Sequence, residues 1–223
     1  MSRASKYDET YIAEVVDVND PEKRCRVKIN VYDMFDGVPK EQLPWANFML
    51  PLGSRPGEGT LTPVHVGDKV WVRFTGGDSR RPVVVGAAQA APKGKVNLAP
   101  DQWGGEGAYE HKRTESQPEV EKPDYYADDV SKQNNVMIQR CKNGTVRVTQ
   151  LDSGSAVEIT RDGDIVVHCE GKLYLSVKGD ALEEYGGNVE RRIGGDLKEV
   201  CQGSISSVAN GTYTIRGTTV HIN

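Results

Sequence analysis

Glycine recurs in the C-terminal part of the chain at a fixed spacing of eight residues. The series is Gly163, Gly171, Gly179, Gly187, Gly195, Gly203 and Gly211, and Thr219 takes the next position. Glycines in ordinary hairpin turns need no constant spacing, whereas a fixed internal period is typical of repeat architectures. The period predicts octads of one short strand and one corner, where glycine permits a tight bend, including a positive φ.

The same stretch alternates between apolar and polar positions in step with the glycines. Because eight is an even number, the alternation of a strand keeps its phase from one octad to the next. Odd-numbered residues, which share the parity of the glycines, are mostly apolar, and even-numbered residues, including His168, are mostly polar. One dry face and one wet face are therefore expected. The dry face is interrupted by Glu183, Arg191, Glu199 and Ser207.

One octad strand is too small to build a core by itself. A strand of about six residues has a narrow apolar stripe, and single-chain β-helices are commonly built from hexapeptide units. Three chains that wind around one another would cover each other's strand edges. We therefore expect residues 136–223 to form an intertwined triple-stranded β-helix in a homotrimer.

The polar residues of the dry face all lie four positions after their glycine. In a trimer they would form successive rings near the axis, and each Arg191 would reach the carboxylates of Glu183 and Glu199. Pairing or hydration is required because unpaired buried charges are costly. An ion-pair ladder that sets the register is the favoured interpretation, and a functional ion site is the alternative.

The N-terminal part has a different pattern. Between residues 11 and 90, short apolar-alternating runs are separated by Gly, Pro and Asp turns. The five candidate strands are Tyr11–Val18, Cys25–Tyr32, Leu43–Leu52, Lys69–Phe74 and Pro82–Gly86. Five short strands in one small domain favour an OB-fold barrel over residues 1–90.

A polar stretch separates the two patterned regions. Residues 91–135 contain Pro92, Pro100, Pro118 and Pro123 and many charges, which predicts a linker without a core of its own. No amphipathic helix of convincing length occurs anywhere in the sequence. The expected fold class is therefore all-β: an OB barrel, a linker and the triple-stranded helix.

Composition limits the possible functions. Apolar residues make up only 37% of the chain and the net charge is -4, which argues against a thick globular core and against nucleic-acid binding. The polar N-terminus resembles no signal peptide, so we expect a chain made in the cytoplasm with reduced thiols. Disulfides among Cys25, Cys141, Cys169 and Cys201 are the alternative.

Enzymatic chemistry is not indicated. The sequence contains no G-x-S-x-G, H-E-x-x-H, P-loop or C-x-x-C motif. The carboxylates of Asp128 and Asp129 are interpreted as solvated linker residues rather than as an acid–base pair. We expect neither a catalytic residue nor a cofactor.

Several stretches together resemble the central spike protein of contractile phage tail baseplates, which is related to the VgrG spike of type VI secretion. The octads match that family's triple-stranded β-helix. The N-terminal stretches that carry the resemblance are Val15–Val31 with Asp20-Pro21 in its turn, Leu43–Ala46, Val66–Val72, and Phe74–Gly86, which reads FTGGDSRRPVVVG. Cys25 departs from the pattern, because a glycine commonly precedes the Arg-Val of the second strand. A lysozyme-like insert is also lacking.

The resemblance implies a structural function. The chain would be the homotrimeric needle of the baseplate in a virion, assembled in the host cytoplasm. Its OB domain would bind the ring-shaped hub protein, and its β-helix would point towards the target cell. Sheath contraction would drive the needle through the outer membrane.

The chain end is the candidate tip. Thr219, Val220, His221, Ile222 and Asn223 end the sequence in phase with the octads, and His221 has the dry parity. Some relatives hold iron with an H-x-H motif, but here the pattern is His221-x-Asn223. One histidine per chain weakens the case for a metal, so a separate conical tip protein of the PAAR kind is the favoured partner.

Two other classes of function remain as alternatives. OB folds often bind nucleic acids or oligosaccharides, but such grooves need basic residues and stacking aromatics, and Trp45, Trp71 and Trp103 are isolated. A receptor-binding fibre is the second alternative, and the OB-like module argues against it.

Overall fold

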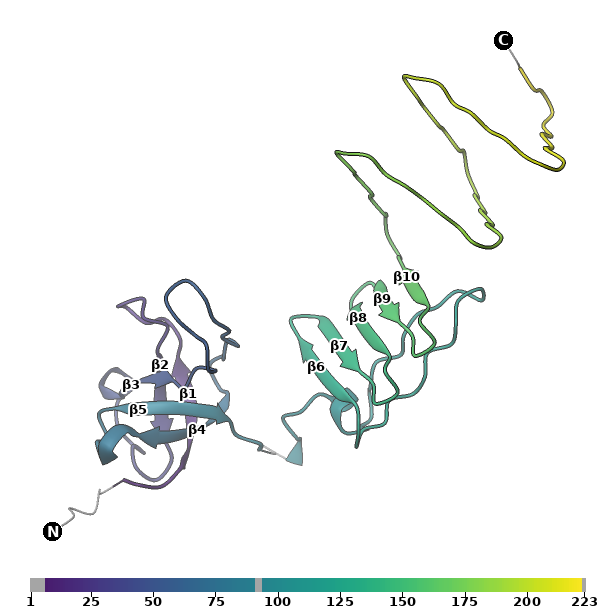
Figure 1. The fold of residues 1–223 in the computed structure, drawn as a ribbon. Coiled ribbons are helices and arrows are strands. Elements are labelled where there is room, and N and C mark those ends of the chain that lie inside the picture. The colour runs from purple at the N-terminus through teal and green to yellow at the C-terminus, as the bar shows by residue number, and fades with distance from the viewer. Residues whose placement is uncertain (1–6, 91–93, 222–223) are drawn as a thin grey trace. The chain divides into compact units, whose positions relative to one another are not determined.

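The computed structural model describes residues 7–90 and 94–221. Over these residues the fold is all-β, with short 3-10 turns and no α-helix. The chain divides into two compact units, Met1–Leu173 and Tyr174–Asn223. Two sheets lie in the first unit (Figure 1). The described part contains no helix that is long and apolar enough to cross a membrane.

The N-terminal sheet is a closed barrel of five strands in the order β1-β2-β3-β5-β4. The strands are β1 (Tyr11–Asp17), β2 (Val27–Val31), β3 (Trp45–Phe48), β4 (Lys69–Phe74) and β5 (Pro82–Ala87). β3 and β5 pair in parallel, and all other neighbours pair antiparallel. The structure confirms the five-stranded barrel expected from the sequence.

Alternating side chains fill the barrel. β2 buries Val27, Ile29 and Val31, and β4 buries Val70 and Val72. Each strand places its aliphatic residues on one side because successive side chains point to opposite faces. Barrel closure pairs both outer strands, so one chain completes this core without a partner.

The turn between β1 and β2 is held by one carboxylate. Asp20 accepts hydrogen bonds from the backbone N–H groups of Glu22, Arg24 and Arg26, and from the Arg26 guanidinium at 2.8 and 3.1 Å. The hydrogen bond from Arg26 holds the pKa of Asp20 well below its usual range. Cys25 has a φ of 57°, in the left-handed region that favours glycine. The residue that departs from the family pattern therefore occupies a backbone position suited to glycine.

The second sheet is an antiparallel meander in the order β10-β9-β8-β7-β6. Its strands are β6 (Asp129–Gln133), β7 (Val136–Arg140), β8 (Val146–Gln150), β9 (Ala156–Ile159) and β10 (Ile165–His168). Asn134 and Asn135, both at positive φ, form the β6–β7 turn. Gly163, the first glycine of the octad series, lies in the β9–β10 turn.

Part of residues 91–135, which were expected to form a linker, is ordered against this sheet. β6 itself lies within residues 91–135. Asp101, in the 3-10 turn Pro100–Gln102, is buried and accepts hydrogen bonds from Lys132 Nζ at 2.6 Å and from the backbone N–H of Tyr109 at 2.6 Å. Hydrogen bonds and ion pairs hold the segment in place. The composition did not predict this ordered segment, because a low content of apolar residues usually indicates a segment without fixed structure.

The second unit has a regular turning path. Among its described residues there is no strand, and the chain alternates between straight segments and bends (Figure 1). Bends occur at residues 178–179, 186–187, 194–195, 202–203, 210–211 and 218–219, and one more at 170–171 lies at the end of the first unit. From 171 onwards each bend includes a position of the octad series.

Candidate assembly site

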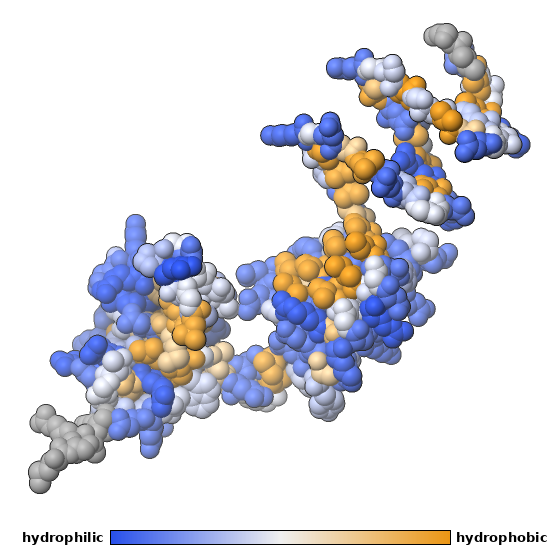
Figure 2. Space-filling model, in the orientation of Figure 1, coloured by the Kyte–Doolittle hydropathy of each residue, from blue (hydrophilic) through white to orange (hydrophobic). Residues whose placement is uncertain are grey.

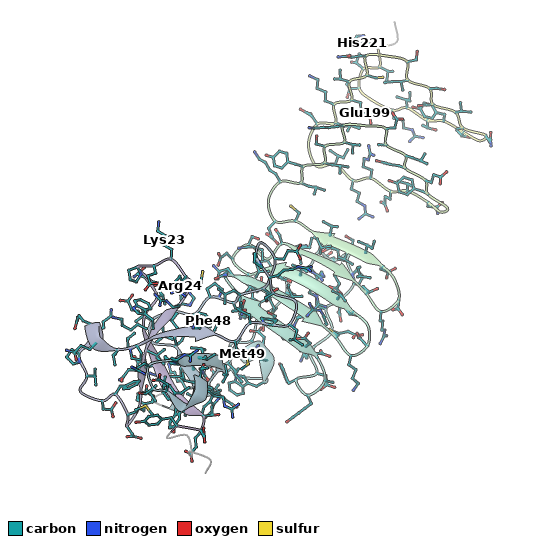
Figure 3. The ribbon with its side chains drawn as sticks, turned by 60° about the vertical axis from the view of Figure 1, so that its left-hand side comes forward. Lys23, Arg24, Phe48, Met49, Glu199 and His221 are labelled. Atoms are coloured by element: carbon teal, nitrogen blue, oxygen red, sulfur yellow. The ribbon has the colours of Figure 1, made fainter. Side chains whose placement is uncertain are left out.

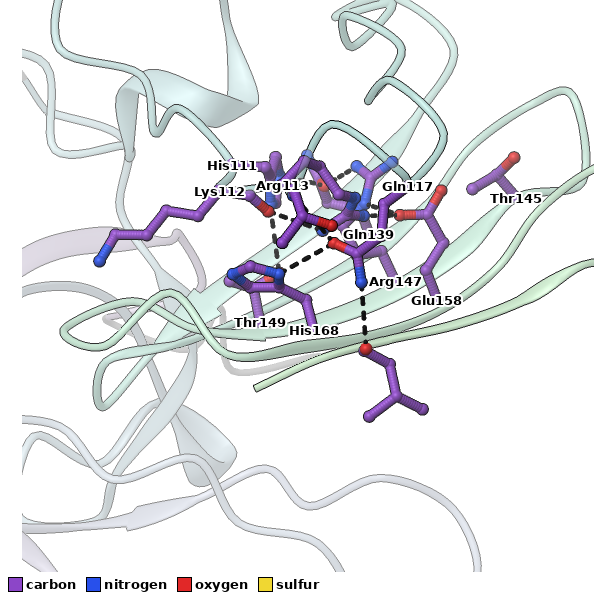
Figure 4. Close-up of polar contacts among 12 residues, drawn as sticks. His111, Lys112, Arg113, Gln117, Gln139, Thr145, Arg147, Thr149, Glu158 and His168 are labelled. Atoms are coloured by element: carbon purple, nitrogen blue, oxygen red, sulfur yellow. Dashed lines mark hydrogen bonds and ion pairs between the residues drawn. The ribbon is translucent and has the colours of Figure 1, made fainter. Parts of the chain in front are cut away.

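The second sheet carries its polar side chains on its covered face. Buried residues on this face are Met137, Gln139, Arg147, Thr149, Ala156, Glu158, Val166 and His168. The segment of residues 109–117, here called the strap, contacts this face through its own polar side chains (Figure 4). Hydrogen bonds and charge pairing therefore dominate the contact between strap and sheet.

Arg147 is the centre of this contact. Its side chain is 2% exposed and donates from Nε to Glu158 and from Nη1 to Gln139, each at 2.7 Å. Arg113 of the strap pairs with the same Glu158 carboxylate (Figure 4). Burial alone would raise the pKa of Glu158, but the two guanidinium groups outweigh it and the pKa is lowered. Glu158 is thus held as a carboxylate between two arginines.

His111 of the strap completes the network as a neutral ring. Its Nε2 lies 3.0 Å from Gln139 Oε1, and its Nδ1 lies 3.3 Å from Thr149 Oγ1. A proton on Nε2 alone satisfies both contacts, because the threonine hydroxyl then donates to Nδ1. Burial, with Arg147 nearby, lowers the pKa of His111 to about 4. The ring is therefore uncharged at neutral pH.

His168 lies on this covered face, so its assignment to the wet face was wrong. It is 7% exposed, and its ring nitrogens lie 2.9 Å from Gln117 Oε1 and 2.8 Å from Glu170 Oε1. Parity correctly separated His168 from Ile165 and Val167. The polar side is the buried one here because the strap covers it, and no periodicity in the sequence indicates that.

The opposite face of the same sheet is aliphatic and exposed. Its aliphatic residues, here called the aliphatic face, are Val136, Ile138, Val146, Val148, Val157, Ile159, Ile165 and Val167, of which Ile138 is half-buried. Arg140 and Gln150 lie on the same side at its edge. Val148, on the central strand, is 42% exposed, and Ile165 is 72% exposed. Figure 2 shows apolar residues gathered over β8–β10. Contiguous exposed apolar patches are typical of interaction surfaces.

The octads also leave their dry set exposed in a single chain. Leu175 is 84% exposed, and Leu173, Val177, Tyr185, Val189, Ile193 and Leu197 are all exposed. The three residues assigned to inner rings, Glu183, Arg191 and Glu199, are exposed as well. Arg191 Nη1 lies 3.7 Å from Glu199 Oε1, which is one octad further along the chain. The pairing partner expected for Arg191 is therefore within reach even in one chain.

The corner glycines differ from one another in backbone conformation. Gly163 has a φ of 89°, whereas Gly171, Gly179, Gly187, Gly195, Gly203 and Gly211 do not lie in the left-handed region. A Cβ added at any of these six would meet nothing within 4 Å. Only Gly163 thus needs glycine for its φ, and nothing within the chain itself explains the other six.

At the chain end, Thr219, Val220 and His221 are described and exposed, while Ile222 and Asn223 lie outside the described residues. Figure 3 places His221 and Glu199 within the turning chain of the second unit. Within residues 7–90 and 94–221 no group of three or more His, Cys, Asp or Glu is arranged to hold a metal ion.

The barrel has a groove that the sequence did not indicate. It measures about 530 Å³ and lies between the β1–β2 turn, β3 and the loop that follows β3. Figure 3 labels Arg24 and Phe48, which line it, and the neighbouring Lys23 and Met49. Leu50 lines the groove and is half exposed. Such a groove forms from loops, whose path the strand pattern does not determine.

One comparison with known proteins bears on the barrel. Residues 11–88 match the family model described as the type VI secretion system/phage-baseplate injector OB domain. This range includes all five barrel strands. The match indicates an OB domain of the baseplate injector kind and a structural role at a phage or secretion-system baseplate. A search of curated proteins gave no match.

Proposed function

We propose that the protein is the homotrimeric central spike of a contractile injection machine, the baseplate of a phage tail. Three octad regions wind into a triple-stranded β-helix, and sheath contraction drives this needle through the outer membrane of the target cell. The role is mechanical rather than catalytic. The observation that carries the proposal is the octad region, whose apolar set stays exposed in a single chain.

Exposure of this extent supports a multi-chain structure. From Gly171 to His221 the octads form no strand ladder within one chain, so the backbone groups of these residues have no sheet partner there. Side chains such as Leu175 and Leu197 stay mostly exposed, at 84% and 59%, in the single chain. Neighbouring chains that supply the adjacent strands would provide both the backbone hydrogen-bond partners and the burial of the apolar side chains.

The six glycines without positive φ support the same arrangement. Glycine in a strand marks either a special backbone conformation or the close approach of another backbone. The first reason fails at Gly171 and at the later glycines of the series, which have ordinary φ and open space around them. The second reason requires another chain at every corner.

Charge pairing along the helix axis follows from this arrangement. Arg191 and Glu199 already approach each other across one octad at 3.7 Å. In a trimer, rings of Glu183, Arg191 and Glu199 would alternate in sign along the axis. Such a ladder would set the axial register of the three chains, because a shifted chain would leave the ring of Arg191 and the two carboxylate rings incomplete.

The two ends of the spike would bind different partners. The OB barrel would bind the baseplate hub, and the groove beside Phe48 and Leu50 is the candidate surface. The C-terminal residues from Thr219 would carry a separate PAAR-like tip protein. A metal ion held by three copies of His221 is the alternative at the tip.

The native mass of the purified full-length chain tests the proposal. We expect a mass near three times that of the 24.5 kDa chain, because the apolar residues of the octads stay exposed in a single chain. A monomer at micromolar concentration would contradict the interleaved helix. Metal analysis of the same sample separates the two tip hypotheses, since a stoichiometric metal would favour His221.

A further inference from the structure

We propose that the aliphatic face of β7–β10 is a second interface between three copies of this chain, separate from the intertwined octads. Three sheets would pack with these faces inward around the spike axis, forming a three-sided prism. The inference rests on the proposed trimer. It says how the sheet β7–β10, which has no glycines at a constant spacing, would pack in that trimer.

The polarity of the sheet supports this assignment. An antiparallel sheet with one covered face normally covers its apolar side and exposes its polar side. This sheet does the reverse, because the strap covers Arg147, Glu158 and Gln139 and leaves the aliphatic side open. Placing the strap on the other side would have buried the aliphatic residues within one chain. The aliphatic side therefore remains available for another molecule.

The register makes the aliphatic face continuous. Ile138 lies opposite Val148, Val148 opposite Val157, and Val157 opposite Val167. A second row pairs Val146 with Ile159 and Ile159 with Ile165. The first row crosses four strands without a polar interruption, and the second crosses three and ends at Arg140 of β7, so the surface can pack as one apolar layer with a polar edge.

A polar rim limits the face on the β6 side. Ser131 lies opposite Ile138, and Gln133 lies opposite Val136. Further along, Arg140 pairs with Asp129 at 2.8 Å, and both side chains are exposed. An aliphatic centre with a hydrated polar rim is the usual composition of a protein–protein interface.

The octad phase identifies the occupant as copies of this chain. β10 follows Gly163, so it is both the last strand of the sheet and the first strand of the octad series. Ile165 and Val167 have the odd parity of the octads' dry set and lie on the aliphatic face. If the odd residues of the octads face the other two chains, the same side of β10 faces them too. If a different protein covered the aliphatic face, the odd-numbered residues would face that protein in β10 and the other two chains in the next octad.

Thiol accessibility in the full-length chain tests the proposal. The four natural cysteines are replaced by serine, and Val148→Cys is introduced on the central strand. Val38→Cys in the barrel is the matched control, because Val38 is 37% exposed and Val148 is 42% exposed in the single chain. We expect a bulky maleimide to modify Val148→Cys at least about tenfold more slowly than the control, since a buried thiol reacts only through local opening.

A second variant separates this inference from the trimer itself. Val157→Cys, on the neighbouring strand, should be protected like Val148→Cys, which guards against a local defect in one variant. If the native mass is that of a trimer but both thiols react as fast as the control, the prism is wrong and the proposed spike stands. If the mass is that of a monomer, both proposals fail. Protected thiols in a trimer support both.

Discussion

The barrel and the octad region use the same alternation of apolar and polar residues but bury it differently. In the barrel, Ile29 is fully buried, whereas in the octads Leu175 is 84% exposed. Five strands of one chain can close into a barrel and pair every edge. A series of single strands joined by corners has no such closure. The difference teaches that an alternating pattern predicts strands but does not say which chain completes the sheet.

The second sheet lies between these two cases. It has strand ladders within one chain, as the barrel has, and an exposed aliphatic side, as the octads have. Its covered side is made from charge pairs and amides rather than from aliphatic packing. One face is therefore covered by the chain itself, and the other stays exposed in the single chain.

Removing the ring arginine should produce the largest effect. In the proposed trimer, Arg191→Ala would leave the facing carboxylates without a partner near the axis, and we expect a loss of about 3 to 5 kcal/mol, seen as a marked fall in Tm. Arg192→Ala is the matched control, because Arg192 has the wet parity and pairs with Glu190 at 2.7 Å on the surface. Equal Tm values for the two variants would remove Arg191 from the axis.

The corner glycines provide a comparison between neighbouring residues. Gly195 belongs to the octad series and Gly194 does not, yet a Cβ at either meets nothing within 4 Å in one chain. We expect Gly195→Ala to destabilise the proposed trimer by about 2 to 3 kcal/mol through contact with another chain, and Gly194→Ala by much less. Thermal unfolding of both variants measures the difference. Similar small losses would mean that no chain approaches the corner.

Acid should weaken the strap before the barrel. The pKa of His111 is lowered to about 4 by burial and by Arg147, from about 6.5 in the unfolded chain. The unfolded chain therefore gains a proton first as the pH falls, and stability decreases between about pH 6.5 and pH 4, by at most about 3 kcal/mol. The lowered pKa of Glu158 adds a further loss at more acidic pH.

Urea unfolding from pH 8 to pH 4 measures this effect. His111→Asn should flatten the decrease between about pH 6.5 and pH 4, because the group that gains the proton is gone. His65→Asn is the control, since His65 is exposed in the barrel and should leave the profile unchanged. A profile that His111→Asn does not alter would contradict the neutral buried ring.

The smallest effect is expected in the β1–β2 turn of the barrel. Cys25 has a φ of 57°, and glycine adopts this conformation without steric cost. Cys25→Gly should stabilise the barrel by about 0.5 to 1 kcal/mol after the entropy of the unfolded glycine is subtracted. Cys25→Ala removes the thiol without relieving the backbone and should give no gain. Chemical denaturation of both variants separates the two causes.

The sequence alone determined the features that depend on neighbouring residues, namely the strands and the bends. Alternation and turn residues placed the strands of the barrel, because inward and outward positions differ by one residue. The same parity assigned Ile165 and Val167 to one side of β10 and His168 to the other. The period of eight also located the bends after residue 170, each of which falls on a position of the series.

Only the tertiary structure decided which side of each strand is covered. The strap lies far from β8 and β9 in sequence. Its contact with the sheet depends on Arg113 and Arg147, which both pair with the carboxylate of Glu158. Composition suggested a linker there, because buried charge pairs resemble solvated charges in a sequence. Alternation separates two faces of a strand, but long-range packing determines which of them meets solvent, a segment of the same chain or another chain.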